Sequence, residues 1–211
     1  MIVAIDGPAG AGKSTVARAL AKRLSFRYLD TGAMYRALTW LAMYRGLDLG
    51  AGDALARLAQ AEPVTFDLEG RVWIGGKDVT SSIREQRIDR MVPVVARHPA
   101  VREVMRERQR ELGRDGDVVI EGRDIGTVVA PQAEVKVYLV ADRDERARRR
   151  MADRPGIGAD ALATDIRVRD EKDAERMRPA GDAQEIDTTG MEVEDVVAKI
   201  EALVRERTTT V

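Results

Sequence analysis

The feature that most constrains this chain is a glycine-rich motif that follows a short apolar run. The run, Ile2-Val3-Ala4-Ile5, is typical of a strand buried on both faces. A helix is predicted from Lys13 to Leu24, because apolar side chains recur there at four-residue spacing. Two glycines five residues apart, followed by Lys and Ser, lie between the strand and the helix: Gly7-Pro8-Ala9-Gly10-Ala11-Gly12-Lys13-Ser14. This order of strand, loop and helix predicts a phosphate-binding loop.

The residue types in this motif suit the phosphates of a nucleoside triphosphate. Glycine permits a positive φ and lets the backbone approach an anion closely. The side chain of Lys13 can reach the outer phosphates, and the hydroxyl group of Ser14 can hold Mg²⁺. We therefore expect a nucleoside triphosphate with Mg²⁺, and Ser14 as the metal ligand. The residues expected to bind this nucleotide are contiguous: Gly7, Pro8, Ala9, Gly10, Ala11, Gly12, Lys13, Ser14 and Thr15.

Strand and helix patterns alternate at both ends of the chain. Besides the first strand, apolar runs predict strands at 26–29, 117–120, 135–140 and 185–187, and helical patterns separate them. This alternation favours a parallel sheet with helices on both faces. The predicted fold class is therefore α/β, with a P-loop NTPase-like parallel five-stranded sheet. We read residues 187–190, Asp-Thr-Thr-Gly, as a loop after the last strand rather than as the switch of a GTPase.

The pattern changes in the middle of the chain. Val64, Phe66 and Leu68 alternate with polar neighbours, and Val72 and Ile74 do so again after a turn. A second turn at 75–76 precedes a short strand at 78–79, so we expect a small antiparallel meander. We interpret residues 63–98 as an insertion into a single domain whose core comprises 1–62 and 99–211.

Three helices are predicted beside this meander. One runs from Ala33 to Arg45, with Asp30 or Thr31 as its cap. A short one is expected to be capped by Asp53. A charged helix is expected to start at Pro99 and to stop at residue 113.

Composition excludes several classes of protein. With 44% hydrophobic residues and a net charge of -1, the chain is neither a disordered segment nor an overall basic nucleic-acid binder. The absence of cysteine excludes disulfides and thiolate chemistry, and the single His98 argues against histidine-cluster metal sites. No apolar run reaches membrane length, and Asp6 interrupts the start of the chain where a signal peptide would be apolar. We expect a cytoplasmic protein.

Two further motifs follow predicted strands. Asp30-Thr31-Gly32-Ala33-Met34-Tyr35-Arg36 begins a helix. Glu121-Gly122-Arg123-Asp124-Ile125-Gly126-Thr127 leaves the carboxyl end of a buried strand, where open α/β sheets bind their ligands. Together with the phosphate loop and the insertion, these motifs resemble the bacterial-type cytidylate kinases over nearly the whole chain.

The resemblance implies the reaction and the partners. A P-loop nucleoside monophosphate kinase of this family transfers a phosphoryl group from ATP to CMP, and we expect dCMP as a second acceptor. The implied protein is a monomer that uses Mg²⁺ and binds neither nucleic acid nor membrane. The insertion at 63–98 then corresponds to the monophosphate-binding subdomain, and residues from about 150 to 178 correspond to a helical lid.

The resemblance also implies roles at matching positions. Asp124 accepts from the exocyclic amine of cytosine, which is the pairing expected of an Asp with this base. Arg102 donates to the base, although on sequence alone a solvated helix face explains it as well. Arg36 and Arg123 hold the monophosphate, and Tyr35 lines the same pocket. Thr31 completes the expected CMP-binding residues beside the helix start.

Three residues of the expected lid lie on one helix face. Arg169, Asp173 and Arg176 are spaced four and three residues apart, as in an ordinary salt-bridged surface helix. The resemblance implies instead that Arg169 and Asp173 hold the ribose and that Arg176 reaches the transferring phosphate. The expected catalytic residues are then Lys13, Arg123, Arg169 and Arg176. Arg149 and Arg150 are expected to add positive charge near the ATP.

One position departs from the family pattern, and two other functions stay open. The family often has a hydroxyl residue nine positions before Arg102, where this chain has Pro93. The contact of that hydroxyl with the base is therefore left unassigned. A kinase for another monophosphate such as UMP is the nearer alternative, and a nucleotide-dependent switch or binding module is the more distant one.

Overall fold

The described part of the chain forms two compact units. The computed structural model describes residues 1–67, 69–114, 116–153, 163–164, 166–168, 170–171 and 177–209. One unit, called here the sheet unit, comprises Met1–Leu29 and Gly116–Val211. The other, called the helical unit, comprises Asp30–Asp115.

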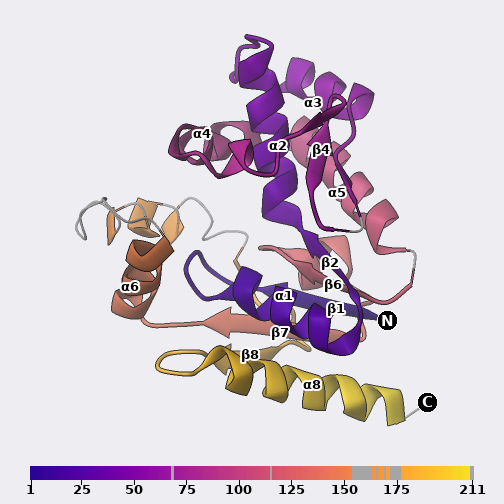
Figure 1. Ribbon diagram of the computed structural model, residues 1–211, viewed down its shortest axis with the longest axis vertical. Coiled ribbons are helices and arrows are strands. Elements are labelled where there is room, and N and C mark those ends of the chain that lie inside the picture. Colours follow the sequence, from indigo (N-terminus) through magenta and orange to yellow (C-terminus); the bar gives the residue numbers. More distant parts are fainter. Residues whose placement is uncertain are drawn as a thin grey trace. The chain divides into compact units, whose positions relative to one another are not determined.

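The sheet unit is built on five strands. Their order across the sheet is β2 (Arg27–Asp30), β6 (Val118–Glu121), β1 (Ile2–Asp6), β7 (Val135–Val140) and β8 (Gln184–Asp187). The strand β1 pairs in parallel with both β6 and β7, and β7 pairs in parallel with β8 (Figure 1). The predicted five-stranded parallel sheet is therefore confirmed.

The central strand is buried because it has a strand on either side and helices over the sheet. Val3, Ala4 and Ile5 are all completely buried. The helices α1 (Lys13–Leu24) and α8 (Val193–Thr209) contribute Leu20 and Ile200 to the same apolar cluster as β1, β7 and β8. Burial of this continuous apolar surface is the main favourable contribution to the stability of the unit.

The end of α1 sets the start of β2. Ser25 adopts a left-handed conformation with a φ of 58°, and the N–H group of Phe26 donates back to the carbonyl oxygen of Ala21 at 2.9 Å. This arrangement satisfies carbonyl groups at the end of the helix and reverses the chain. The strand consequently starts at Arg27, one residue after its predicted start.

Two more helices belong to the sheet unit. A π-helix, η2 (Ile125–Val129), follows β6, and α6 (Arg143–Asp153) follows β7. Residues 163–164, 166–168 and 170–171 are also helical. The expected lid, from about 150 to 178, is thus described only in part.

The helical unit combines helices with a small antiparallel sheet. Its helices are α2 (Thr31–Tyr44), α3 (Gly52–Ala61), the 3-10 helix η1 (Ser82–Arg84), α4 (Gln86–Ala96) and α5 (Pro99–Gly113). Its strands are β3 (Thr65–Phe66), β4 (Val72–Ile74) and β5 (Lys77–Asp78), paired antiparallel in that order. The predicted meander is confirmed, with its third strand one residue earlier than expected. Leu38, Leu55 and Ile83 are completely buried in this unit.

Two local predictions differ from the structure. Asp53 does not cap α3, because the helix already begins at Gly52 and its N-cap residue is Ala51. Asp53 lies in the first turn instead, where a carboxylate still interacts favourably with the helix dipole. The helix α4 is not among the predicted elements, and it contains Pro93.

The bounds of the insertion stay a prediction. The helical unit contains residues 63–98 together with α2, α3 and α5. In the part of the chain that is described, no helix combines the length and the apolar character that a membrane crossing requires.

The close approach of Gly7 to β7 leads to a test of stability. Gly7 has a φ of 146°, and a Cβ atom there would overlap the carbonyl oxygen of Leu139. We expect Gly7→Ala to lower the free energy of unfolding by about 2 to 4 kcal/mol, from strain and overpacking combined. Urea unfolding followed by circular dichroism measures this. Gly181→Ala is the control, since nothing lies within 4 Å of its added Cβ. Equal stability of the two variants would contradict the expectation.

Candidate active site

The phosphate loop joins the carboxyl end of β1 to the amino end of α1. Gly10 and Gly12 both have positive φ angles, of 80° and 90°. Gly12 is the N-cap residue of α1 and has no side chain with which to cap it. The first-turn N–H groups and the positive end of the helix dipole therefore suit an anion at this point. The predicted strand, loop and helix are confirmed.

The side chain of Lys13 lies against this loop. Its Nζ atom donates to the carbonyl oxygen of Pro8 at 2.8 Å. The ammonium group therefore lies next to the loop backbone, where it adds positive charge to that of the helix end.

The buried Arg146 of α6 supports the loop from one side. Its Nη1 atom donates to the carbonyl oxygen of Ala9 at 3.2 Å, and its guanidinium group forms a two-point ion pair with Asp170 at 3.0 and 2.7 Å. A Cβ atom on Gly10 would lie 2.9 Å from the Cβ atom of Arg146. Gly10 is therefore needed for α6 to pack this closely against the loop.

Thr188 supports the loop from the end of β8. The hydroxyl group of this buried residue lies between the carbonyl oxygens of Ala11 and Val140, at 3.2 and 3.1 Å, and its one hydrogen is shared between them. Arg149 donates to Oγ1 and to the carbonyl oxygen of Thr188 at 2.9 and 2.6 Å. A Cβ atom on Gly12 would lie 3.5 Å from Nη1 of Arg149. Residues 188–190 thus form a loop after the last strand, whereas Asp187, expected in that loop, is the final residue of β8. Arg149 lies beside the start of α1.

Glu121 lies beside the phosphate loop as well. This buried residue ends β6, the neighbour of β1, and its Oε2 atom accepts from Oγ of Ser14 at 2.9 Å. The hydroxyl group of Tyr28 donates to Oε1 of the same carboxylate. Glu121 is not among the site residues predicted from the sequence. A carboxylate at the carboxyl end of a buried strand was the available signal, but the adjacency of β6 to β1 was needed to use it.

The turn after β6 carries Arg123 and Asp124, and a buried carboxylate holds it. Oδ1 and Oδ2 of Asp6 accept from the N–H groups of Ile125 and Gly126 at 2.9 and 2.7 Å. Burial raises the pKa of Asp6, and these two hydrogen bonds offset part of the rise. Nη1 of Arg123 lies 3.2 Å from Sδ of Met177. The structure thus places the turn with Asp124 next to the strand that leads into the phosphate loop.

In the helical unit, the expected phosphate-binding arginine lies on the first turns of α2. Nε of Arg36 donates to Oδ1 of the buried Asp89 at 3.0 Å. Asp30 is the N-cap residue, and it accepts from the N–H group of Ala33 at 2.8 Å, so one of the two expected caps is confirmed. A Cβ atom on Gly32 would lie 3.0 Å from Nη1 of Arg36. These contacts hold the guanidinium group beside the start of α2.

The other expected residues of the helical unit lie on two helices. Thr31 is buried at the first position of α2, and the carbonyl group of Tyr35 accepts from Thr39 one turn later. Arg102 is half-buried in the first turns of α5, and its N–H group donates to the carbonyl oxygen of His98. The role of Arg102 toward a base stays a prediction.

The expected lid residues Arg169, Asp173 and Arg176 lie outside the described residues. Of this region, Asp170 is described, through its ion pair with Arg146.

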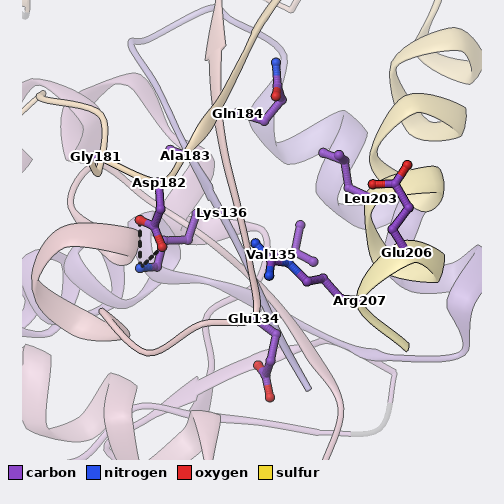
Figure 2. Close-up of a pocket in the computed structure, with 10 residues that line it drawn as sticks. All are labelled: Glu134, Val135, Lys136, Gly181, Asp182, Ala183, Gln184, Leu203, Glu206 and Arg207. Atoms are coloured by element: carbon purple, nitrogen blue, oxygen red, sulfur yellow. Dashed lines mark hydrogen bonds and ion pairs between the residues drawn. The ribbon is translucent and has the colours of Figure 1, made fainter. Parts of the chain in front are cut away.

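An open pocket lies at the other end of the sheet. The first residues of β7 and β8 and the last turns of α8 line it (Figure 2). Nζ of Lys136 points to Asp182 there, at 3.0 and 2.8 Å from its two carboxylate oxygens (Figure 2). Parallel α/β sheets bind ligands at the carboxyl ends of their strands, whereas this pocket lies at the amino ends. The candidate active site is therefore the phosphate loop and the ends of β1 and β6.

Comparison with known proteins points to one family. The family model described as cytidylate kinase matches residues 3–206. A cytidylate kinase from Pelotomaculum thermopropionicum is 49% identical over 214 residues, covering 96% of this chain and 95% of that protein. A cytidylate kinase from Geobacillus sp. is 46% identical over 216 residues, covering 97% of this chain and 96% of that protein.

Solved structures give the same fold. A shikimate kinase from Bacteroides thetaiotaomicron has a TM-score of 0.51 and 20% identity, covering 97% of this chain and 98% of that one. At this identity the likeness concerns the fold alone.

The Tyr28 contact leads to a second test of stability. Tyr28→Phe removes the hydroxyl group that donates to the buried carboxylate of Glu121. We expect it to lower the free energy of unfolding by about 1 to 3 kcal/mol, as for the loss of a hydrogen bond to a charged group. Urea unfolding measures the change. Tyr44→Phe is the control, because Tyr44 is exposed on α2. A loss no larger than that of the control would show that the Glu121 contact contributes little.

Proposed function

The chain belongs to the cytidylate kinase family, and from this we propose that it transfers the γ-phosphoryl group of ATP to CMP, giving ADP and CDP. We propose dCMP as a second acceptor. The observation that carries the proposal is the phosphate loop whose Ser14 contacts Glu121, in a chain that the family model matches from residue 3 to 206. Such a loop binds the donor, and the family gives the acceptor.

The acceptor supplies its own nucleophile. A monophosphate with a second pKa of about 6 is largely dianionic at neutral pH, so its oxygen can attack without a general base. Catalysis then requires that two anionic groups be aligned and that the charge on the transferring phosphoryl be stabilised. Lys13, with its ammonium group on the phosphate loop, is suited to the donor side. Arg36 and Arg123 are proposed to hold the monophosphate.

We propose Mg²⁺ as the cofactor, held by Ser14 and Glu121. Mg²⁺ takes oxygen ligands and often uses only one or two protein side chains in addition to substrate phosphates and water. The hydroxyl group of Ser14 and the carboxylate of Glu121 are 2.9 Å apart beside the phosphate loop, so these residues fit that requirement. When bound, the ion would neutralise charge on the outer phosphates of ATP.

Base recognition is proposed to depend on Asp124. A carboxylate accepts from the exocyclic amine of cytosine, whereas uracil presents a carbonyl oxygen at the same position. Arg102 is proposed to donate to the base, and Thr31 and Tyr35 are proposed to line the pocket. In the lid, the ribose is proposed to contact Arg169 and Asp173, and the transferring phosphoryl group to contact Arg176.

We further propose that the protein acts as a monomer in the cytoplasm, without nucleic acid or membrane partners. The near balance of 35 basic and 36 acidic residues supports the part of this proposal that concerns nucleic acid, because it leaves no excess positive charge for a polyanionic partner.

A coupled assay of ADP release tests the function. The protein is incubated with ATP and Mg²⁺ and with CMP, dCMP, UMP or no acceptor. We expect the highest kcat/KM with CMP and little release without an acceptor. Release that does not depend on an acceptor would indicate a nucleotide hydrolase or switch instead, and a preference for UMP would indicate a different kinase.

Lys13→Ala is expected to leave the fold intact and to lower kcat by at least about a hundredfold, because charge between the outer phosphates is no longer neutralised. Steady-state kinetics and circular dichroism are measured on the same sample. Lys22→Ala is a matched control, since Lys22 is exposed in the last turn of the same helix. Near-normal turnover in folded Lys13→Ala would remove Lys13 from the catalytic residues.

Asp124→Ala is expected to lower kcat/KM for CMP far more than kcat/KM for UMP. Loss of the charged partner of a base amine costs about 1 to 3 kcal/mol, so kcat/KM for CMP should fall roughly tenfold or more. The value for UMP should change little or rise. Steady-state kinetics with both acceptors measure this difference, and thermal melting checks that the variant is folded. Asp53→Ala, at an exposed position of α3, should leave the ratio unchanged. An equal loss for both acceptors would refute base recognition by Asp124.

A further inference from the structure

We propose that Asp6 is a positioning residue that sets the acceptor specificity by holding the turn on which Asp124 lies. The inference rests on the proposed function, since it assigns to Asp6 the placement of a group that reads the base. Asp6 ends β1 and immediately precedes the phosphate loop, so the sequence alone suggests no part for it in acceptor binding.

The carboxylate of Asp6 is shared between two consecutive backbone groups. Oδ1 accepts from the N–H group of Ile125 at 2.9 Å, and Oδ2 accepts from that of Gly126 at 2.7 Å. Asp6 is only 6% exposed, so water replaces neither contact easily. Both oxygens of the side chain are therefore used to fix the direction of the backbone directly after Asp124.

A carboxylate suits this place better than its neutral analogue. An amide side chain offers one acceptor oxygen and one NH₂ donor. With Asn at position 6, one of the two N–H groups would face a donor instead of an acceptor. A buried N–H group left in this way is costly, and the turn would move to satisfy it.

Asp6 is itself held firmly, so it can act as an anchor. It pairs with Tyr138 in the register of β1 and β7. The next residue, Gly7, approaches the backbone of Leu139 so closely that a Cβ atom would overlap it. The N–H group of Gly122 donates to the carbonyl oxygen of Ile5 at 3.0 Å, which ties the start of the turn to β1 as well.

The far side of the turn is also confined. A Cβ atom on Gly126 would lie 3.3 Å from Cδ of Lys136 and 3.4 Å from Oδ2 of Asp6. The carbonyl group of Asp124 accepts from the N–H groups of Val128 and Val129 at 2.9 and 3.2 Å, at the start of η2. Asp124 thus lies between a helix start and the two Asp6 contacts. A change at Asp6 shifts it without removing its carboxylate.

The test compares acceptors rather than total activity. In Asp6→Asn we expect kcat/KM for CMP to fall about tenfold or more, because small misplacement of a binding group has large effects. The kcat/KM for UMP should fall less, so the ratio of kcat/KM for CMP to kcat/KM for UMP, called here the CMP to UMP ratio, should drop. The KM for ATP should change less than the KM for CMP. Asp67→Asn is a control for the substitution itself, because Asp67 also accepts from two backbone N–H groups, those of Glu69 and Arg71. Both donate to Oδ1, so the amide oxygen of Asn can keep both.

A double variant separates positioning from general destabilisation. If Asp6 acts through Asp124, then Asp6→Asn should not lower the CMP to UMP ratio further in a chain that already carries Asp124→Ala. A merely structural role would lower kcat/KM for both acceptors alike in Asp6→Asn, and this result would overturn the proposal. An additive loss of the ratio in the double variant would overturn it too.

A second variant covers the case in which Asp6→Asn does not fold. Gly126→Ala presses a methyl group lightly against Lys136 and Asp6 and keeps every hydrogen-bonding group. It should lower the CMP to UMP ratio in the same direction but by less. An unchanged ratio in folded Gly126→Ala would overturn the proposal.

The wild type and Asp124→Ala keep the two proposals apart. If the wild type does not prefer CMP, or if Asp124→Ala lowers kcat/KM equally for CMP and UMP, the proposed function of Asp124 fails. If Asp124→Ala abolishes the preference while Asp6→Asn behaves like Asp67→Asn, the positioning role of Asp6 alone fails.

Discussion

The contact between the backbone at Gly7 and the carbonyl group of Leu139 determines where β1 ends and the phosphate loop begins. Only glycine fits at this position, because a Cβ atom would overlap the carbonyl oxygen of Leu139. The chain then forms the phosphate loop, and Gly12 at the end of this loop is the N-cap residue of α1. The supports of the loop, Arg146 and Thr188, come from segments that follow the neighbouring strands β7 and β8. The anion site therefore depends on the order of strands in the sheet.

Two buried carboxylates at adjacent strand ends organise the rest of the site. Asp6 ends β1 and Glu121 ends β6, and both are almost fully buried. Each is compensated differently: Asp6 by two backbone N–H groups and Glu121 by the hydroxyl groups of Ser14 and Tyr28. Burial of a charge is unfavourable unless it is hydrogen-bonded, so these contacts fix the loop and the turn as well as satisfying the charges.

Much of the fold could be predicted from local patterns, because strand and helix periodicity is a property of neighbouring residues. The phosphate loop and the helix start at Pro99 are of this kind. Contacts that depend on strand order could not be predicted. Glu121 was read as the first residue of a motif, and its proximity to Ser14 follows from the pairing of β6 with β1. The roles proposed for Arg102 and for the lid residues rest on the resemblance, and the structure leaves them predictions.

Local rules also failed where tertiary packing overrode them. A proline in a helix removes a backbone hydrogen bond, and α4 contains Pro93. In the structure, Ile88 and Val95 of α4 are buried, and burial of these side chains stabilises the helix despite the proline. The predicted N-cap residue, Asp53, lies two positions after the observed N-cap residue, Ala51, because single residues define helix ends poorly.

The position of β1 in the middle of the sheet has a consequence for how the chain folds. Ile2 pairs with Val118 and Val3 pairs with Val135, so both neighbours of the first strand lie more than a hundred residues downstream. Closing such long loops costs entropy and slows folding. During synthesis the apolar strand cannot take its place until β6 and β7 have been made. The residues of the helical unit are contiguous and all precede β6, so they can pack among themselves while β1 still waits for its partners.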